Sequence, residues 1–311
     1  MAKSIRQVYG EALARMGHEN DKLVVLDADV SSSTQTKFFA KEFPQRFFNM
    51  GIAESNMVAT AAGLAQQGFV PFVNTFAVFV TSIGLIATRA LACYGDFNVK
   101  LAGAYCGLSD AFDGASHHAT EDIAIMRALP NMKVLCPSDA LSSEALTKLA
   151  AGTHGPCYLR LSRDVYPDLY SEGQTFVPGK GNIVRDGSDV TVIACGIMVH
   201  KALEAAEALK AEGVSVRVVD MYSIKPLDTE LVQRCAAETG AIITAEEHGI
   251  NGGLGSAVAE AIVAGDKQVP MERVGVKDTF TESGPYTQLL AKYGLDAPAV
   301  AEAIKTVIKR K

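Results

Sequence analysis

The sequence predicts an α/β protein of two doubly wound domains, each a mostly parallel sheet flanked by helices. Short apolar runs alternate with longer amphipathic segments in both halves of the chain, as they do in parallel sheets. The length of 311 residues suits about two domains. A stretch rich in Pro, Gly and polar residues interrupts the alternation. We therefore expect a first domain over 1–165, a linker over 166–187 and a second domain over 188–311.

The first half begins with an amphipathic segment that lacks the apolar block of a signal peptide, so we expect a helix at 1–17. Strands are expected where apolar residues run together, and helices where they follow helical spacing. The expected strands are 22–29, 69–76, 99–105, 132–138 and 157–162. The further expected helices begin at 54 or cover 78–93, 121–129 and 139–151.

The second half repeats the alternation after the expected linker. The expected strands are 190–196, 214–220, 241–247 and 271–276. The expected helices are 200–213, 226–240 and one from about 255. This order of strand, helix and strand indicates a second parallel sheet with its own helices.

The composition excludes several classes of protein. A hydrophobic content of 48 % with 21 % charged residues indicates a large core. A net charge of −6 without a basic run argues against nucleic acid as a partner. No apolar run reaches the roughly 18 residues that span a bilayer. Six scattered cysteines without a CxxC motif indicate free, buried thiols in a reducing compartment, so we expect a cytoplasmic protein.

One carboxylate lies at an unexpected place. Glu54 follows Gly51-Ile52-Ala53 and opens a helix that is apolar on nearly every side. A helix that is hydrophobic all round is usually buried. A Glu placed only to favour the helix dipole would gain about 0.3–1 kcal/mol, but a solvated Glu would serve equally well. The apolar surroundings therefore favour a functional carboxylate.

The loop 108–122 follows the expected strand 99–105, and ligands of open parallel sheets bind beyond the carboxyl ends of strands. Asp113 precedes a Gly, and His117 and His118 follow within a run of small residues. A solvated turn would explain a single His, but two His after Asp-Gly favour a site. The pair does not predict a metal site, because adjacent side chains diverge and the helical spacing of His ligands is absent.

Two further motifs have ordinary structural explanations. The run 252–256, GGLGS, lacks the third glycine of a dinucleotide fingerprint, because position 258 is Val, so it indicates a glycine-rich helix entry. Phe76 and Phe79 lie three residues apart at a helix start and share a face. Their spacing alone indicates core packing, whereas a place beside a site at the sheet end would make them an aromatic wall for a flat ligand.

Three segments carry a resemblance to a known family. The segment 48–79, with its Gly-Ile-Ala-Glu, resembles the pyrimidine-binding domain of transketolases. The segment 113–132 resembles the loop that follows there, and 236–260 resembles the C-terminal domain of the family. The resemblance covers essentially the whole chain, in order, and implies an enzyme dependent on thiamine diphosphate.

The resemblance assigns four residues to the cofactor. It implies that Glu54 hydrogen-bonds a ring nitrogen of the aminopyrimidine and holds the proton there. This role explains the apolar surroundings of Glu54, since water would compete for that proton. Phe76 and Phe79 correspond to aromatic residues that pack against the pyrimidine, and Ile52 belongs to the same Gly-Ile-Ala-Glu motif.

The resemblance assigns five residues to the substrate. His117 corresponds to a His near the reacting carbons, and Asp113 to an Asp that contacts a substrate hydroxyl. Arg163 corresponds to an Arg that binds a terminal phosphate. Arg6 and Ser33 are further anion contacts by weaker local similarity. Arginine suits this role because its planar fork pairs with tetrahedral oxyanions.

Three departures from the family pattern fall near the cofactor ring or the substrate tail. Gly103 stands where the family has a His, Ser82 stands where it has a Tyr, and 109–114 is about two residues longer than its counterpart. The chemical identity of the substrate tail is therefore left open by the sequence. A different anionic group, a branched sugar or a shorter substrate would each fit.

The sequence lacks the Gly-Asp-Gly and downstream Asn that mark the family's diphosphate-binding domain. We therefore expect no metal ligands in this chain and a separate N-terminal subunit that holds the diphosphate through Mg²⁺. Two copies of each chain, an α2β2 assembly, follow from the usual two-fold symmetry. The chain is interpreted as half of an enzyme.

Four functions are consistent with this resemblance. The favoured one is the C-terminal subunit of a split transketolase, which moves a two-carbon ketol unit from an anionic ketose to an aldose. The β subunit of a 2-oxoacid dehydrogenase shares Gly-Ile-Ala-Glu but usually carries a different stretch at 74–79 and lacks the segment 113–118. A carboligase similar to deoxyxylulose-phosphate synthase is normally one long chain. A non-enzymatic regulatory homologue is disfavoured by the intact set of site residues.

Overall fold

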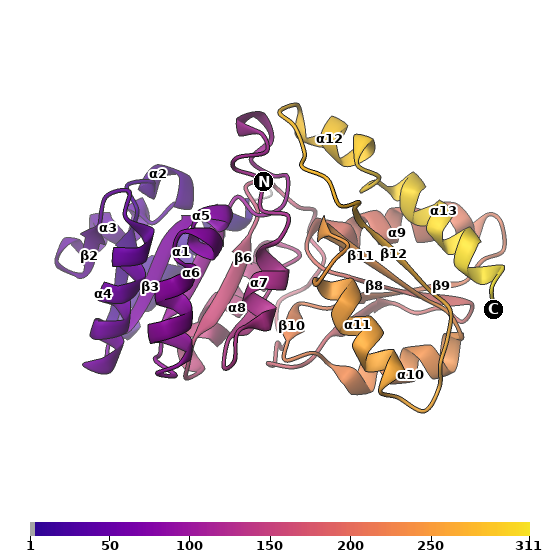
Figure 1. Ribbon diagram of the computed structural model, residues 1–311, viewed down its shortest axis with the longest axis horizontal. Helices are drawn as coiled ribbons and strands as arrows, with labels where there is room; N and C mark the ends of the chain where they lie inside the picture. The colour runs from indigo at the N-terminus through magenta and orange to yellow at the C-terminus, as the bar shows by residue number, and fades with distance from the viewer. Residues whose placement is uncertain (1–3) are drawn as a thin grey trace.

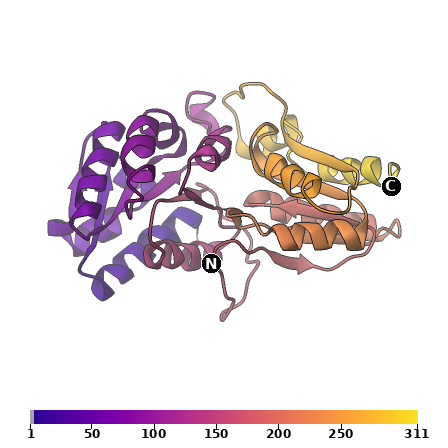
Figure 2. The same ribbon diagram turned by 60° about the horizontal axis from the view of Figure 1, so that its bottom comes forward.

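The computed structural model describes residues 4–311 and contains two sheets that lie side by side (Figure 1). The first is seven-stranded, in the order β10-β5-β6-β4-β3-β1-β2, and the second is five-stranded, in the order β12-β11-β8-β9-β7. Every neighbouring pair is parallel except β10 with β5 and β7 with β9. Helices cover both sheets, as the view in Figure 2 also shows. The predicted fold class is therefore confirmed.

The first sheet is formed mostly by the first half of the chain. Its strands are β1 (Leu23–Asp27), β2 (Phe47–Asn49), β3 (Val70–Phe76), β4 (Lys100–Ala104), β5 (Lys133–Leu135), β6 (Cys157–Leu161) and β10 (Ser223–Lys225). Its main helices are α1 (Ile5–Glu19), α2 (Ser31–Thr34), α3 (Lys37–Glu42), α4 (Glu54–Gln66), α7 (Asp122–Ala128) and α8 (Ala140–Gly152). The interior strands β1, β4 and β6 are buried along their whole length, which matches their continuous apolar runs.

The second sheet is formed by the second half of the chain. Its strands are β7 (Asn182–Arg185), β8 (Val190–Ala194), β9 (Val216–Asp220), β11 (Ile242–Gly249) and β12 (Met271–Val276). Its helices are α9 (Ile197–Lys210), α10 (Thr229–Thr239), α11 (Leu254–Val263), α12 (Tyr286–Lys292) and α13 (Ala297–Ile308). Helix α10 begins where the Asp228 side chain accepts a hydrogen bond from Leu231 N and ends at Gly240 in the left-handed region.

Several segments differ from the expectation, and α2, α3, α12, α13 and β10 were not expected at all. The helix expected over 78–93 is divided into α5 (Ala77–Ser82), α6 (Leu85–Ala87) and the π-helical segment η2 (Thr88–Cys93). The break follows from the backbone at the end of α5, where Phe79 O accepts bonds from two successive amides. The short strand β2 was not expected. The segment expected to be a linker contains β7, which pairs with β9 at the edge of the second sheet.

The second half of the chain contributes one strand to the first sheet. Strand β10 comes from the second half of the chain and pairs antiparallel with β5 at the edge of the first sheet. Ser138 Oγ, at the end of β5, donates to Asp220 Oδ1 at 2.8 Å. The hydroxyl of Tyr170 donates to the other oxygen of Asp220 at 2.6 Å. These contacts fix the orientation of the halves near the middle of the chain.

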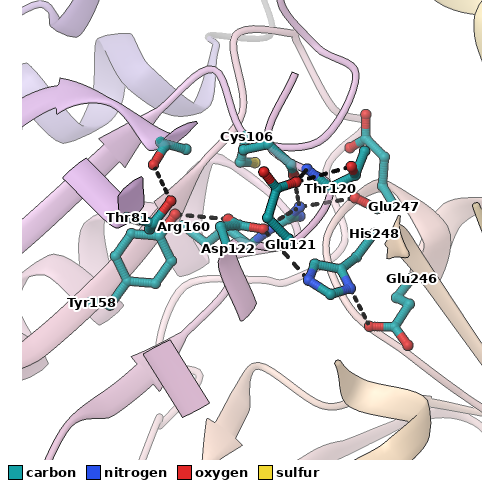
Figure 3. Close-up of polar contacts among 12 residues, drawn as sticks. Thr81, Cys106, Thr120, Glu121, Asp122, Tyr158, Arg160, Glu246, Glu247 and His248 are labelled. Carbon is teal, nitrogen blue, oxygen red and sulfur yellow. Dashed lines mark hydrogen bonds and ion pairs between the residues drawn. The ribbon is translucent and has the colours of Figure 1, made fainter. Parts of the chain in front are cut away.

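A buried ion pair lies at the contact between the two halves (Figure 3). Arg160 of β6 and Asp122 of α7 are 2 % and 0 % exposed, and two hydrogen bonds of 2.8 and 3.1 Å join them. The hydroxyl of Tyr158 also donates to Asp122, at 2.7 Å. Arg160 Nη2 donates to the main-chain oxygen of Glu247 on β11, at 2.8 Å. The guanidinium therefore connects the first sheet to the second.

Two properties expected from composition can be checked directly. The six cysteines all lie among the described residues, where they are buried and form no disulfide. Within residues 4–311, no helix has both the length and the apolar composition needed to cross a bilayer.

Replacing Arg160 by Met should strongly destabilise the chain, because the Asp122 carboxylate would remain buried without its partner. Losing one member of a buried pair costs about 3–5 kcal/mol. Lys201→Met is a matched control, since Lys201 forms a solvent-exposed pair with Glu204 worth less than about 1 kcal/mol. Urea unfolding monitored by circular dichroism measures both. Equal shifts of the two midpoints would contradict the role given to Arg160.

Candidate functional site

The candidate site lies at the carboxyl ends of β3 and β4 in the first sheet. Glu54 is the first residue of α4 and is only 3 % exposed. Within residues 4–311 its carboxylate accepts one long hydrogen bond, 3.5 Å from Thr75 Oγ1 to Oε1. Ile52, two residues earlier, is 84 % exposed. The buried Glu54 carboxyl therefore lies close in sequence to an accessible apolar side chain, and most of the hydrogen-bonding capacity of this carboxyl is unused.

Three side chains form an aromatic cluster beside this carboxyl. Phe76 ends β3 and Phe79 lies in α5, with ring centroids 5.9 Å apart. The His117 ring meets them edge-on at 5.9 and 5.1 Å respectively. Because Phe76 directly follows Thr75, the strand end brings this cluster close to Glu54. The set provides apolar faces and one acidic group for a flat ring with a basic nitrogen.

Tyr105 connects the aromatic cluster to two arginines. Its ring lies 4.8 Å from that of Phe76. Arg6 Nη1 donates to the Tyr105 hydroxyl at 2.8 Å, and the guanidinium carbons of Arg6 and Arg163 each lie 5.2 Å from the ring centroid. Arg6 also donates to the main-chain oxygen of Ser33 at 2.8 Å. Ser33 therefore contacts Arg6 through its backbone and not through its hydroxyl.

The loop between β4 and α7 brings two carboxyl groups and a His together. Ligand atoms of Asp110, Asp113 and His117 lie within 4.8 Å of one another. Within residues 4–311 this is the one group of three or more such side chains close enough to hold a cation. Arg163 Nη1 already pairs with Asp110 Oδ1 at 3.4 Å, so a second cation would be repelled here. We interpret the group as a set of polar side chains suited to hydrogen-bonding the hydroxyl groups of a ligand.

The environment of Asp110 changes its acidity. The residue is 1 % exposed, and the pKa of its carboxyl is raised to about 6, first by burial and then by the Asp113 carboxylate. His117 and Arg163 lower this pKa and so offset part of the rise. Asp110 therefore changes charge near neutral pH.

The structure brings most of the sequence-predicted residues together. Phe76, Phe79, Asp113, His117, Arg6 and Arg163 are linked by the contacts above, and Glu54 lies beside them through Thr75. Ile52 has no such contact with the others and is simply exposed next to Glu54.

The structure shows the surroundings of two of the departures noted in the sequence. A Cβ at Gly103 would lie 2.6 Å from the Tyr158 hydroxyl and 3.0 Å from Ala77 Cα, so Gly103 leaves room for Tyr158 beneath the start of α5. Tyr105, two residues further on, is the side chain that this strand end sends to the site. Ser82 is exposed at the end of α5, where its hydroxyl bonds to Val78 O.

Sequence reasoning missed Tyr105, Asp110 and Thr75. Tyr105 and Thr75 lie at the carboxyl ends of apolar strands, and that position was the available signal for both. Asp110 lies in the loop 108–122, where no separate signal distinguishes it from Asp113.

Comparisons with known proteins agree with this geometry. The sequence model of the transketolase pyrimidine-binding domain matches residues 1–168, and that of the transketolase C-terminal domain matches residues 179–300. The chain therefore belongs to the transketolase family.

The relatives are both split and full-length transketolases. A putative transketolase C-terminal section of Methanocaldococcus jannaschii is 43 % identical, with 99 % of this chain and 97 % of the relative covered. Human transketolase is 39 % identical over 98 % of this chain, which spans only 49 % of the human protein. A 6-deoxy-6-sulfo-D-fructose transketolase subunit of a Clostridium species is 38 % identical, with 99 % and 95 % covered.

Solved structures include a similar split-gene protein. A split-gene transketolase described as an inactive β4 tetramer superimposes with a TM-score of 0.92 at 50 % identity, with 98 % of each chain covered. A transketolase from Leishmania mexicana gives a TM-score of 0.84 at 25 % identity, with 99 % of this chain and 46 % of that chain covered.

The Asp110 carboxyl should titrate near pH 6 and respond in opposite directions to its neighbours. Asp113→Asn should lower the Asp110 pKa because it removes a like charge, and Arg163→Gln should raise it because it removes a positive one. Carbon-13 NMR of the Asp110 carboxyl measures both. Asp164→Asn, at an exposed carboxylate next to Arg163, serves as the control and should leave this pKa nearly unchanged. Shifts of the same sign in the two test variants would contradict the arrangement.

Proposed function

We propose that this chain is the C-terminal subunit of a transketolase that depends on thiamine diphosphate and transfers a two-carbon ketol unit from an anionic ketose to an aldose. The observation that carries the proposal is the buried Glu54 carboxyl beside the half-buried rings of Phe76 and Phe79. These residues fit the pyrimidine half of the cofactor, because Glu54 has hydrogen-bonding capacity left and the rings offer apolar faces. Membership of the transketolase family supports the same assignment.

Glu54 holds a proton at the ring nitrogen in this proposal, and its burial keeps water from competing for that proton. Phe76 and Phe79 orient the ring and exclude solvent from it. When bound, the cofactor supplies a carbon nucleophile and an electron sink. His117 contacts both aromatic rings, so it is placed to move a proton at the reacting carbons of the sugar.

The substrate lies along the line from His117 to the two arginines. Asp113 accepts a hydrogen bond from a sugar hydroxyl, and Arg163 with Arg6 binds the anionic tail on either side of Tyr105. A phosphate or another tetrahedral oxyanion suits this pair. The Clostridium relative is described as a 6-deoxy-6-sulfo-D-fructose transketolase subunit, which supports including both a phosphate and a sulfonate tail in the proposal.

The diphosphate and its Mg²⁺ are assigned to a partner. Mg²⁺ prefers octahedral oxygen ligands, and the one candidate cation group among residues 4–311 lies in the loop between β4 and α7, next to Arg163. The matches to about half of full-length transketolases support a separate N-terminal subunit that supplies the other half. We propose an α2β2 assembly located in the cytoplasm, where the six buried thiols stay reduced.

An apolar surface beside Glu54 supports this partnership. Ile83, Ile86, Leu91 and Tyr94 are 53, 79, 38 and 90 % exposed and follow one another along the chain around α6 and η2. Ser55, next to Glu54, donates to Ile83 O at 2.5 Å, so this surface borders the entrance of α4. Contiguous exposed apolar residues are typical of binding surfaces. The proposed partner therefore covers both this surface and the cofactor.

Glu54→Gln should lower turnover of the reconstituted complex by about 10²–10⁴-fold, because an amide cannot hold and return the proton. The fold should persist, since the carboxylate makes only one long hydrogen bond. Steady-state ketol transfer measures the loss, and thermal unfolding checks the fold. Glu42→Gln, in an exposed pair with His18, is the control and should be fully active. A Glu54→Gln complex with normal turnover would refute the cofactor assignment.

The purified chain alone should show no ketol transfer, and activity should appear on mixing with the N-terminal subunit. Ile86→Glu should prevent this reconstitution, because it puts a charge into the apolar surface. Val263→Glu is the matched control, since Val263 is 73 % exposed on α11 of the second sheet. Size-exclusion chromatography and activity on titration measure both. Turnover by the isolated chain, or assembly of the Ile86→Glu variant, would count against the half-enzyme interpretation.

A further inference from the structure

The loop that carries Asp113 and His117 is held largely by the second half of the chain. We call residues 106–120 the substrate loop. Its two ends are closed by reciprocal backbone hydrogen bonds of 3.1 and 3.0 Å between Gly107 and Ala119. Between these ends it has little regular structure of its own, only the short 3₁₀ turn at Ala111–Asp113. Its conformation must therefore be fixed from outside.

The backbone of the substrate loop is strained. Ala111 has a φ of 54°, and Tyr105, just before the loop, has a φ of 58°. Both are in the left-handed region that side chains rarely adopt. Such conformations persist only where the surrounding structure imposes them. Contacts from both halves of the chain impose this one: in the first half Arg163 N donates to Ser109 Oγ at 3.2 Å, and the contacts described next come from the second half.

Glu247 makes the central contact. It lies on β11, is 2 % exposed, and its Oε1 accepts a hydrogen bond from the Leu108 amide at 2.7 Å. A Cβ at Gly107 would lie 2.4 Å from the Glu247 carboxyl carbon, so the loop approaches this side chain as closely as only glycine permits. The main-chain oxygen of Glu247 is in turn held by Arg160 at 2.8 Å.

The segment before α12 holds the rest of the loop. Thr281 Oγ1 lies 2.6 Å from Nδ1 of His118, the residue next to His117. Ser283 Oγ donates to Phe112 O, and Gly284 N donates to Ala111 O at 3.3 Å. Figure 1 shows the loop at the top of the molecule, beside the segment that leads to α12. These contacts flank Asp113 on one side and His117 on the other.

The neighbouring carboxylate provides an internal contrast. Glu246 is 1 % exposed, and its two oxygens accept from Leu254 N and Gly255 N at 2.7 and 2.8 Å. It therefore stabilises the start of α11 within the second half of the chain. Figure 3 shows the two carboxylates pointing away from each other, with His248 between them. Glu246 and Glu247 are equally buried, but only Glu247 reaches the substrate loop.

We infer that Glu247 is a positioning residue for the sugar: through the Leu108 amide it fixes the loop that presents Asp113 and His117. The second half of the chain thereby sets sugar recognition without touching sugar or cofactor. Thr281 assists at the other end of the loop through His118. The functional part of this inference rests on the proposed transketolase activity. The structural part does not.

Hydrogen–deuterium exchange of the chain tests the structural part without any activity. Glu247→Ala should accelerate exchange in peptides covering 106–118, whereas Glu246→Ala should accelerate exchange at the start of α11 instead. Glu247→Gln should protect the loop nearly as wild type does, because its amide oxygen can still accept from Leu108 N. Thr281→Val gives a second, milder probe if Glu247→Ala does not fold. Unchanged exchange in the loop of both Glu247→Ala and Thr281→Val would overturn the inference.

Kinetics of the complex with the N-terminal subunit test the functional part. Glu247→Ala should reduce kcat/KM for the sugars by roughly 10–100-fold, since displacements of about 1 Å near reacting groups have effects of this size. The apparent affinity for thiamine diphosphate should stay within about twofold, because Glu54, Phe76 and Phe79 lie on other elements. Glu247→Gln should restore most of the sugar kinetics, and Glu246→Ala should leave them near wild type.

The outcomes separate the two proposals. Equal losses of sugar kinetics in Glu246→Ala and Glu247→Ala would reduce Glu247 to a general stabilising residue and overturn the inference. Loss of cofactor affinity in Glu247→Ala would do the same. A wild-type complex without ketol transfer would refute the proposed function instead, and the exchange experiment would still decide whether Glu247 holds the loop.

Discussion

The buried ion pair between Arg160 and Asp122 is the contact on which the arrangement of the two halves depends. Both groups are removed from water, so each requires the other, and the pair is stable only with its additional hydrogen bonds. One of these bonds goes to the main chain of Glu247 on the other sheet. The ion pair therefore couples the stability of the first sheet to the position of β11. Glu247, the residue of β11 whose side chain contacts the substrate loop, is therefore positioned through this ion pair.

The site follows from the geometry of parallel strands. Strands β3 and β4 end at the same edge, so Tyr105 lies beside Thr75 and Phe76 although it is about 30 residues away in sequence. A helix entrance adds Glu54, and a strained loop adds His117. The end beside Glu54 is buried and aromatic, whereas the end beside Asp113 and the two arginines is charged and more exposed. In the proposed function, this division shields the cofactor from water and leaves the sugar free to enter and leave.

Much of this could be predicted from the sequence, because the relevant signals are local. The alternation of apolar strands and amphipathic helices predicted both sheets, and the membership of the transketolase family is confirmed. Glu54 is a candidate site residue from the sequence alone because it is a charged residue at the start of an otherwise apolar helix. Errors arose where pairing between distant segments decided the outcome. Strand β7 formed inside the expected linker because the edge of β9 was available, and β10 joined the other sheet.

The sequence by itself determined the two-sheet α/β architecture and most of its strands and helices, since these depend on residue type and short-range spacing, and the family resemblance supplied most of the candidate site residues. Only the tertiary structure decided which groups face one another. Tyr105 contacts the aromatic cluster just beyond the end of β4, where its φ of 58° departs from strand geometry, and no local pattern in the sequence signals that turn. Glu246 and Glu247 are adjacent in sequence and equally buried, yet they serve different halves of the chain. The alternation of a β-strand separates them, and what lies on each side is fixed by packing over a range that no local pattern encodes.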